Sequence, residues 1–197
     1  MSIIIKIKTS KKFSKKQNGL LNFIKRHNPI LILEKLTNRK LKRTIIIRHK
    51  FLKKEAKFKD NVIYIDFNNE VKYLWLCICH ELAHIILETP PPWYKNKKIN
   101  KIIKTQKDNI SKYRYTFLQA IEQGLAILLQ AACENKASIR KLNWQTWKTT
   151  FNYMGVKNFG EKLWEDWLKY LNNRSRYKNI DQWILEELEK YWGNKTF

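Results

Sequence analysis

Cysteine is scarce in this sequence, and its few copies form no recurring pattern. Only 3 cysteines occur among 197 residues, at Cys77, Cys79 and Cys133. Small domains held together by disulfides usually carry an even number of cysteines at regular spacings. The sparse, odd set therefore argues against a disulfide framework and against a cysteine-rich zinc ribbon. We expect three reduced thiols, which are most simply small hydrophobic side chains in a core.

Long apolar runs are also missing. The isoleucine-rich start of the chain is interrupted by Lys6 and Lys8, so it is too short for a secretory signal, and no small-residue cleavage site follows. No stretch is long and uncharged enough to cross a bilayer. We therefore expect a cytoplasmic protein with no membrane partner. No internal repeat or low-complexity linker divides the chain, which suits one domain over residues 1–197.

Acidic residues are few, because 17 Asp and Glu face 40 Lys and Arg, which gives a formal net charge of +23. Such an excess favours an acidic partner such as nucleic acid. However, lysine far outnumbers arginine and isoleucine and asparagine are plentiful, a composition that an AT-rich genome also produces. Nucleic-acid sites tend to use arginine for its planar fork, and no nucleic-acid motif is present. Nucleic acid is therefore an alternative partner that no motif supports.

The sequence does contain two β-branched stretches before its longest apolar helix. Residues 44–48 and 61–67 read as strands, and the alternation in 61–67 puts odd-numbered and even-numbered residues on opposite faces. The charged segment between them, 51–59, reads as a turn or hairpin loop. Residues 71–88 are apolar almost all round, which indicates a buried helix. Asn68 or Asn69 is the expected N-cap, and prolines 90–92 stop the helix.

More helices are expected on both sides of this central one. Residues 3–7 form a short strand or an ordered tail, and two helices follow at 14–27 and 30–36. Residues 93–108 are a basic connection, longer than most loops, that carries a short helix or acts as a lid. Another strong helix covers 111–134, and two or three tryptophan-rich helices follow residue 137. The pattern predicts an α+β, mostly helical fold with a small sheet before the long buried helix. Residues 1–135 form its first part, and residues 136–197 its tryptophan-rich helical part.

A metal-binding motif lies in the middle of the buried helix. His80-Glu81-Leu82-Ala83-His84 fits H-E-x-x-H, in which two histidines one helical turn apart face the same way and share one metal ion. Buried polar groups need partners, and a Zn2+ ion would account for all three polar side chains together. The histidines would bind the ion, while Glu81 takes the proton of the water that zinc activates and later gives it to the leaving group. We therefore predict a zinc-dependent hydrolase with Glu81 as its catalytic residue.

A catalytic zinc site needs a third protein ligand and an open position for water. Glu122 is the best candidate, because it shares one face of the predicted helix 111–134 with Leu118, Leu125 and Leu129. A carboxylate on such an apolar stripe needs a partner, which a metal ion or a lysine would provide. The small residue Gly124 would let this helix approach a neighbour closely.

Residues 44–132 resemble the gluzincin type of metallopeptidase, in which H-E-x-x-H on one helix is completed by a glutamate on a second. The resemblance rests on the motif, the preceding strands and the run Glu-Gln-Gly-Leu-Ala at 122–126. It implies a zincin-like fold, Zn2+ as cofactor and a peptide or protein substrate that adds to an edge strand, for which residues 61–67 are the candidate. In relatives with Glu-Gly-x-Ala the ligand directly precedes the glycine. That place holds Gln123 here, so Gln123 and Glu88 remain alternatives to Glu122.

The motif predicts a zinc-dependent hydrolase with His80, His84 and Glu122 as metal ligands and Glu81 as general base and acid, and the resemblance implies a metallopeptidase that hydrolyses peptide bonds. The histidine that metzincins carry downstream is absent, since residues 85–90 after His84 contain neither the glycine nor the histidine of that class. One alternative is a non-catalytic protein that keeps the zincin-like scaffold and associates with nucleic acid through its lysine-rich surface. Another is a helical domain in which the motif arose by chance.

Overall fold

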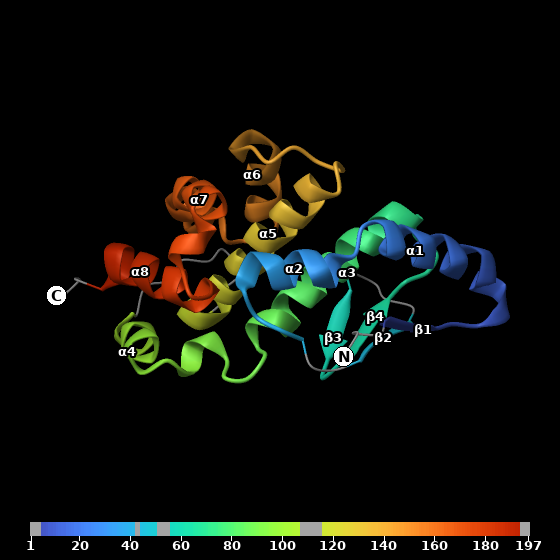
Figure 1. The fold of residues 1–197 in the computed structure, drawn as a ribbon, viewed down its shortest axis with the longest axis horizontal. Coiled ribbons are helices and arrows are strands. Elements are labelled where there is room, and N and C mark those ends of the chain that lie inside the picture. The colour runs from blue at the N-terminus through green and yellow to red at the C-terminus, as the bar shows by residue number, and fades with distance from the viewer. Residues whose placement is uncertain (1–4, 42–43, 51–55, 107–115, 194–197) are drawn as a thin grey trace.

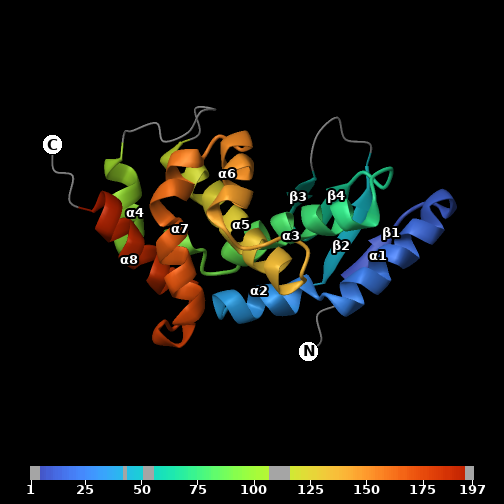
Figure 2. The same ribbon diagram turned by 90° about the horizontal axis from the view of Figure 1, so that it is seen from above.

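A computed structural model of the chain describes residues 5–41, 44–50, 56–106 and 116–193. It has an α+β, mostly helical fold with a small mixed sheet, as predicted (Figure 1). The sheet and α1 (Ser14–Arg26) occupy one end of the molecule. Helices α3 (Val71–Leu87) and α5 (Phe117–Lys136) cross its middle, and α4 (Lys97–Thr105) and α8 (Ile180–Trp192) form the other end (Figure 2). No helix of the described residues is long and apolar enough to cross a bilayer.

The described strands of the sheet follow the order β1 (Ile5–Lys8), β2 (Ile45–His49), β4 (Val62–Ile65) and β3 (Lys57–Lys59). Strands β1, β2 and β4 run parallel, and β3 is antiparallel to β4. The predicted alternation is confirmed, because Ile63, Ile65 and Phe67 are at most 1% exposed. The even-numbered residues between them are only half-buried. One face of the sheet therefore forms part of the core.

The position of β4 corrects the prediction of an edge strand at residues 61–67. This strand lies inside the described sheet, since β2 pairs with it on one side and β3 on the other. Asp60 has a left-handed φ of 57°, a conformation that aspartate tolerates, so the chain reverses there and Lys57–Lys59 pairs back onto β4. The prediction of a loop for 51–59 is thus wrong for 57–59, while 51–55 lie outside the described residues.

Helix α3 is buried on nearly all sides, as its apolar sequence predicts. Its predicted asparagine cap is wrong, because the helix begins after Glu70, which makes no side-chain capping bond. Both asparagines serve the preceding turn instead. The Asn68 amide donates to Asp66 Oδ1 at 2.8 Å, and the Asn69 amide donates to the Asp66 carbonyl at 3.1 Å.

The remaining helices agree well with the predicted ranges. Helices α1 and α2 (Pro29–Thr37) begin and end within about one residue of the predicted ranges 14–27 and 30–36. Helix α5 begins after Thr116, which forms a capping box with Gln119, and positions 111–115 of the predicted helix lie outside the described residues. The basic connection carries the 3-10 turn η2 (Trp93–Lys95) and α4. Three tryptophan-rich helices follow, α6 (Trp144–Tyr153), α7 (Lys157–Asn172) and α8.

Helix α5 packs against both α3 and α7. Gly124 makes the approach to α7 possible, since a Cβ at this position would lie 2.0 Å from Cδ1 of Phe159. The predicted role of this glycine is therefore confirmed, and α7 is the neighbour that it admits. The helices around this contact bury tryptophans that are at most 3% exposed: Trp147, Trp164, Trp167, Trp183 and Trp192.

Candidate metal centre

The two motif histidines converge on one point. His80 and His84 are one turn apart on α3, and their Nε2 atoms lie 3.3 Å from each other. Two nitrogens that are each about 2.0–2.1 Å from a tetrahedral zinc ion are about 3.3 Å apart. The pair therefore already has the separation that a shared zinc ion requires. His80 and His84 thus fit a zinc ion both in their donor atoms and in their spacing.

Both rings are in the protonation state that binds metals. Burial lowers the pKa of His80 to about 4, although its hydrogen bond to Gln130 opposes that shift. Burial also lowers the pKa of His84 to about 3, and the neighbouring His80 lowers it further. Both imidazoles are consequently neutral at pH 7, with a lone pair available for a metal ion.

Neighbouring side chains hold the two rings in place. Oε1 of Gln130 lies 3.0 Å from Nδ1 of His80. The amide of Gln123 lies 3.1 Å from Nε2 of the same ring. Phe58 of β3 stacks on His84, with ring centroids 5.8 Å apart and an interplanar angle of 18°. The site is thus built from three elements: α3, α5 and the end strand of the described sheet.

Glu81 directly follows His80 on α3 and lies on the wall of the same pocket. The pocket has a volume of about 600 Å³, and Glu81 is 7% exposed. Its walls are aromatic and apolar over much of their area, with cations at two points. Besides the motif, they include Lys57, Phe58, Tyr73, Leu76, Gln123, Gln130, Arg140, Tyr153 and Met154. A cavity of this size accepts several residues of an extended peptide or a small molecule.

Glu122, the predicted third ligand, and its neighbour Gln123 differ in their position relative to the pocket of the two histidines. Gln123 lines the histidine pocket, whereas Glu122 is absent from its described lining. Burial and the charge of Glu88 raise the pKa of Glu122 to about 7. Glu88 is the C-cap of α3, so the acidic neighbour of Glu122 lies at the end of that helix. Among the described residues, no three His, Cys, Asp or Glu side chains are grouped so that they could hold a metal ion. Within the part of the chain that the structure describes, no carboxylate therefore joins His80 and His84 as a third ligand in this conformation.

Gln130 and Arg140 are polar residues of the site that the sequence prediction did not single out. Gln130 contacts His80 directly, and Arg140 lies on the pocket wall with its guanidinium 3.8 Å from the ring of Trp147. Gln130 could have been found, since it follows Gln123 by seven residues and so lies on the same face of α5. Arg140 follows the end of α5, and no periodic signal places it.

The chain was compared with protein-family models, with curated proteins and with solved structures, and none of them matches it.

Proposed function

We propose that this chain is a zinc-dependent metallopeptidase of the gluzincin type, with a zincin-like domain. The observation that carries the proposal is the 3.3 Å separation of two neutral imidazole nitrogens beside Glu81 in one pocket. Two uncharged, converging histidines on a buried helix are suited to a shared ligand, because a metal ion would offset part of the cost of burying both polar rings. The H-E-x-x-H order supplies the third functional group that hydrolysis needs.

Each described residue has a definite task in this proposal. His80 and His84 would hold the zinc ion, which would act as a Lewis acid and lower the pKa of a water molecule toward neutrality. The Glu81 carboxylate accepts the proton of the attacking water and then delivers it to the nitrogen of the leaving amine. Strand β3 offers backbone groups on the pocket wall, since it is paired only with β4 among the described strands. An extended peptide would pair with that strand.

Zinc content tests the metal centre. Protein from a zinc-replete preparation is expected to contain about one zinc ion per chain, since one pair of histidines converges. His80→Ala and His84→Ala are each expected to weaken zinc binding by more than about a hundredfold, because loss of a supporting residue alone costs about 10–100-fold. Metal analysis and competition with a chelator measure both. His27→Ala is the matched control, since His27 contacts Phe23 and Trp75 outside the pocket. A folded wild-type protein without zinc would contradict the proposal.

The third ligand is assigned by two further variants in the same zinc measurement. Loss of affinity in Glu122→Gln would assign the position to the carboxylate that the sequence predicts. Loss in Gln123→Leu would assign it to the amide that lies 3.1 Å from Nε2 of His80. The two residues are neighbours on α5, so the variants are matched in location and differ in the donor that they remove.

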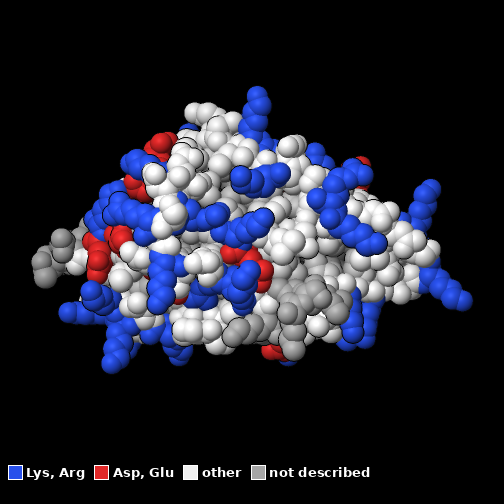
Figure 3. Space-filling view, viewed as in Figure 1, with Lys and Arg blue, Asp and Glu red and all other residues white. Residues whose placement is uncertain are grey.

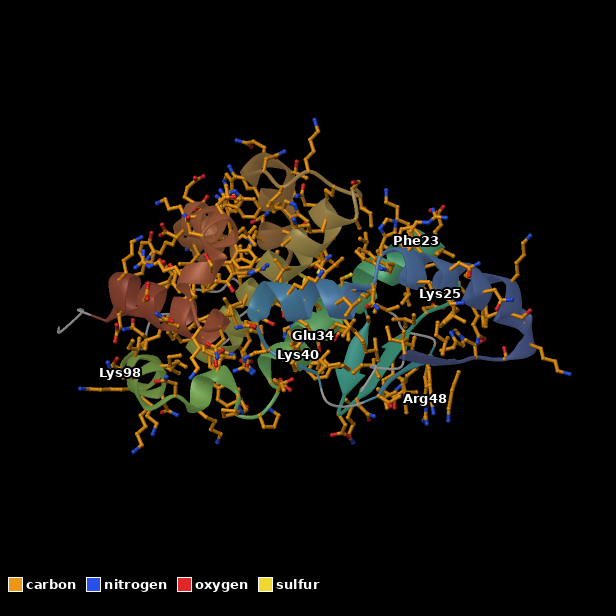
Figure 4. The ribbon with its side chains drawn as sticks, viewed as in Figure 1. Phe23, Lys25, Glu34, Lys40, Arg48 and Lys98 are labelled. Atoms are coloured by element: carbon orange, nitrogen blue, oxygen red, sulfur yellow. The ribbon has the colours of Figure 1, made fainter. Side chains whose placement is uncertain are left out.

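A second candidate function is the non-catalytic binding of nucleic acid, and the N-terminal fifty residues favour it. They contain fifteen Lys and Arg and a single acidic residue, Glu34. Glu34 is 6% exposed and accepts hydrogen bonds from the Leu41 N–H and from Lys40. Figure 4 labels Glu34 and Lys40 next to each other. No exposed acidic side chain therefore offsets the lysines of the described part of this region. Lys and Arg side chains are also scattered over the face shown in Figure 3, where Asp and Glu are fewer.

Salt dependence tests this second function. If the lysines bind phosphates, affinity for double-stranded DNA or RNA is expected to fall at least about a hundredfold between roughly 50 and 200 mM salt. Lys11→Glu with Lys12→Glu is expected to weaken binding further, as measured by fluorescence anisotropy. Lys98→Glu on α4 is the control, because Lys98 lies at the opposite end of the molecule from α1 (Figure 4). If the Lys11/Lys12 double variant and Lys98→Glu weaken binding equally, or if the wild type does not bind at physiological salt, nucleic-acid binding by this region is excluded.

A further inference from the structure

A line of polar side chains runs from His80 along α5 to the far wall of the pocket. Gln130 and Glu134 are one turn apart on α5, and Nε2 of Gln130 donates to Oε1 of Glu134 at 2.8 Å. The other end of the same amide, Oε1, lies 3.0 Å from Nδ1 of His80. Gln130 is therefore a bridge between a carboxylate and a candidate metal ligand.

The donor and acceptor roles along this line have one consistent arrangement. An ionised carboxylate only accepts hydrogen bonds, so Glu134 draws the NH2 group of Gln130 toward itself. The carbonyl oxygen of Gln130 then faces His80, and because it too only accepts, Nδ1 of His80 must carry the proton. A neutral imidazole protonated at Nδ1 has its lone pair on Nε2. That atom is the one that lies 3.3 Å from Nε2 of His84.

Glu134 is buried beside a cation that favours its ionised form. Its side chain is 0% exposed, and Oε2 forms an ion pair with Nε of Arg140 at 3.6 Å, without a hydrogen bond. Arg140 is fixed in turn, because it stacks on Trp147 and donates from Nη2 to Oγ1 of Thr150 at 2.8 Å. Burial raises the pKa of Glu134, and the charge of Arg140 is the main opposing influence. The guanidinium therefore compensates the buried carboxylate, which is otherwise costly.

We propose that Glu134, acting through Gln130, is a positioning residue that fixes the Nδ1-protonated tautomer of His80 and so keeps its Nε2 lone pair directed into the pocket. The benefit of that tautomer for metal binding rests on the proposed function, whereas the tautomer itself is a property of the metal-free protein. Without Glu134 the Gln130 amide can turn over. Its NH2 group would then donate to Nδ1 and favour the opposite tautomer, in which Nε2 carries the proton. In that tautomer the Gln123 amide, 3.1 Å from Nε2, turns its oxygen toward the ring.

The experiment is nitrogen-15 NMR of the histidine rings in the metal-free protein, together with zinc affinity. In wild type, His80 is expected to be protonated at Nδ1 only. In Glu134→Gln the Nε2-protonated form is expected to appear, and zinc affinity to fall about 10–100-fold. The exchanged pair, Gln130→Glu with Glu134→Gln, restores an acceptor-only group at His80 and is expected to return the ring to the wild-type tautomer. A purely structural role for Glu134 would not produce that rescue.

The outcomes separate this inference from the proposed function. An unchanged His80 tautomer in folded Glu134→Gln would overturn the inference even if wild type binds zinc. A tautomer that changes and is rescued in a protein without zinc affinity would support the inference while contradicting the peptidase. If Glu134→Gln does not fold, Gln130→Met removes the acceptor at His80 directly. The same appearance of the Nε2-protonated ring is then expected, and its absence would overturn the inference.

Discussion

Replacing Glu81 with glutamine is expected to slow peptide hydrolysis by about 100–10,000-fold, which is the usual contribution of a positioned general base. Glutamine has the same shape as glutamate but cannot accept the proton of the attacking water at neutral pH. Glu81 is the only carboxylate among the described residues of the pocket wall, so no other group there can replace it as the base. Zinc content is expected to stay at about one ion per chain, because Glu81 is not a ligand in this arrangement.

Mass spectrometry of a mixed peptide library after incubation with zinc-loaded protein measures this effect without a known substrate. Glu70→Gln is the matched control, since Glu70 is an exposed acidic residue that precedes the same helix and makes no capping bond. Its hydrolysis rate is expected to equal that of wild type. Undiminished cleavage by Glu81→Gln would exclude Glu81 as the base. A zinc-loaded wild-type protein that cleaves no peptide would favour the non-catalytic alternative.

The parts of the fold that the sequence predicted are those set by local periodicity. Alternating exposure in 62–67 and the all-round apolar pattern of α3 each follow from the residues within one element. Strand β3 was missed because it is three residues long and exists through its pairing with β4 after the reversal at Asp60. Short strands of this kind depend on a partner that their own sequence does not specify.

The same distinction applies to the candidate site. His80 and His84 were predicted to converge, because residues four apart on a helix share a face whatever surrounds it. The choice between Glu122 and Gln123 depends instead on how α5 is turned toward α3, since neighbouring helical residues point about 100° apart. That rotation is set by tertiary packing such as the contact of Gly124 with Phe159. No pattern within residues 117–136 contains this information.

Arg39 shows the limit most clearly, because its partners are far away in the sequence. Its guanidinium lies at the C-terminal end of α3 and donates to the Thr89 carbonyl at 2.6 Å and the Pro91 carbonyl at 2.9 Å. It also donates to the carbonyls of Ile86 and Leu87 in the last turn of α3, where the regular helical bonds end and the Ile86 carbonyl also accepts from the Thr89 N–H at 3.3 Å. Nε and Nη2 of Arg39 bind both oxygens of Asp181 in the first turn of α8, at 3.0 and 2.5 Å. One side chain therefore joins the end of the motif helix to a helix about 140 residues away in sequence.

Arg39→Met is accordingly expected to lower the free energy of unfolding by about 3–5 kcal/mol, the usual cost of removing one partner of a buried ion pair. Arg39 is only 8% exposed, so water cannot readily replace its contacts to the carbonyls and to Asp181. Denaturant unfolding followed by circular dichroism measures the change as a lower midpoint at constant slope. Arg176→Met is the matched control. Arg176 is 70% exposed where it pairs with Glu186 at 3.5 Å, and its loss is expected to cost less than about 1 kcal/mol.

A double-mutant cycle separates the two contributions of Arg39. Asp181→Leu removes the charge that Arg39→Met leaves unpaired, so the double variant is expected to be more stable than the sum of the single losses predicts. It remains less stable than wild type, because the carbonyls at the end of α3 still lack their donor. Additive effects would show that Arg39 stabilises the protein through those carbonyls alone. An unfolding midpoint for Arg39→Met equal to that of Arg176→Met would contradict both contributions.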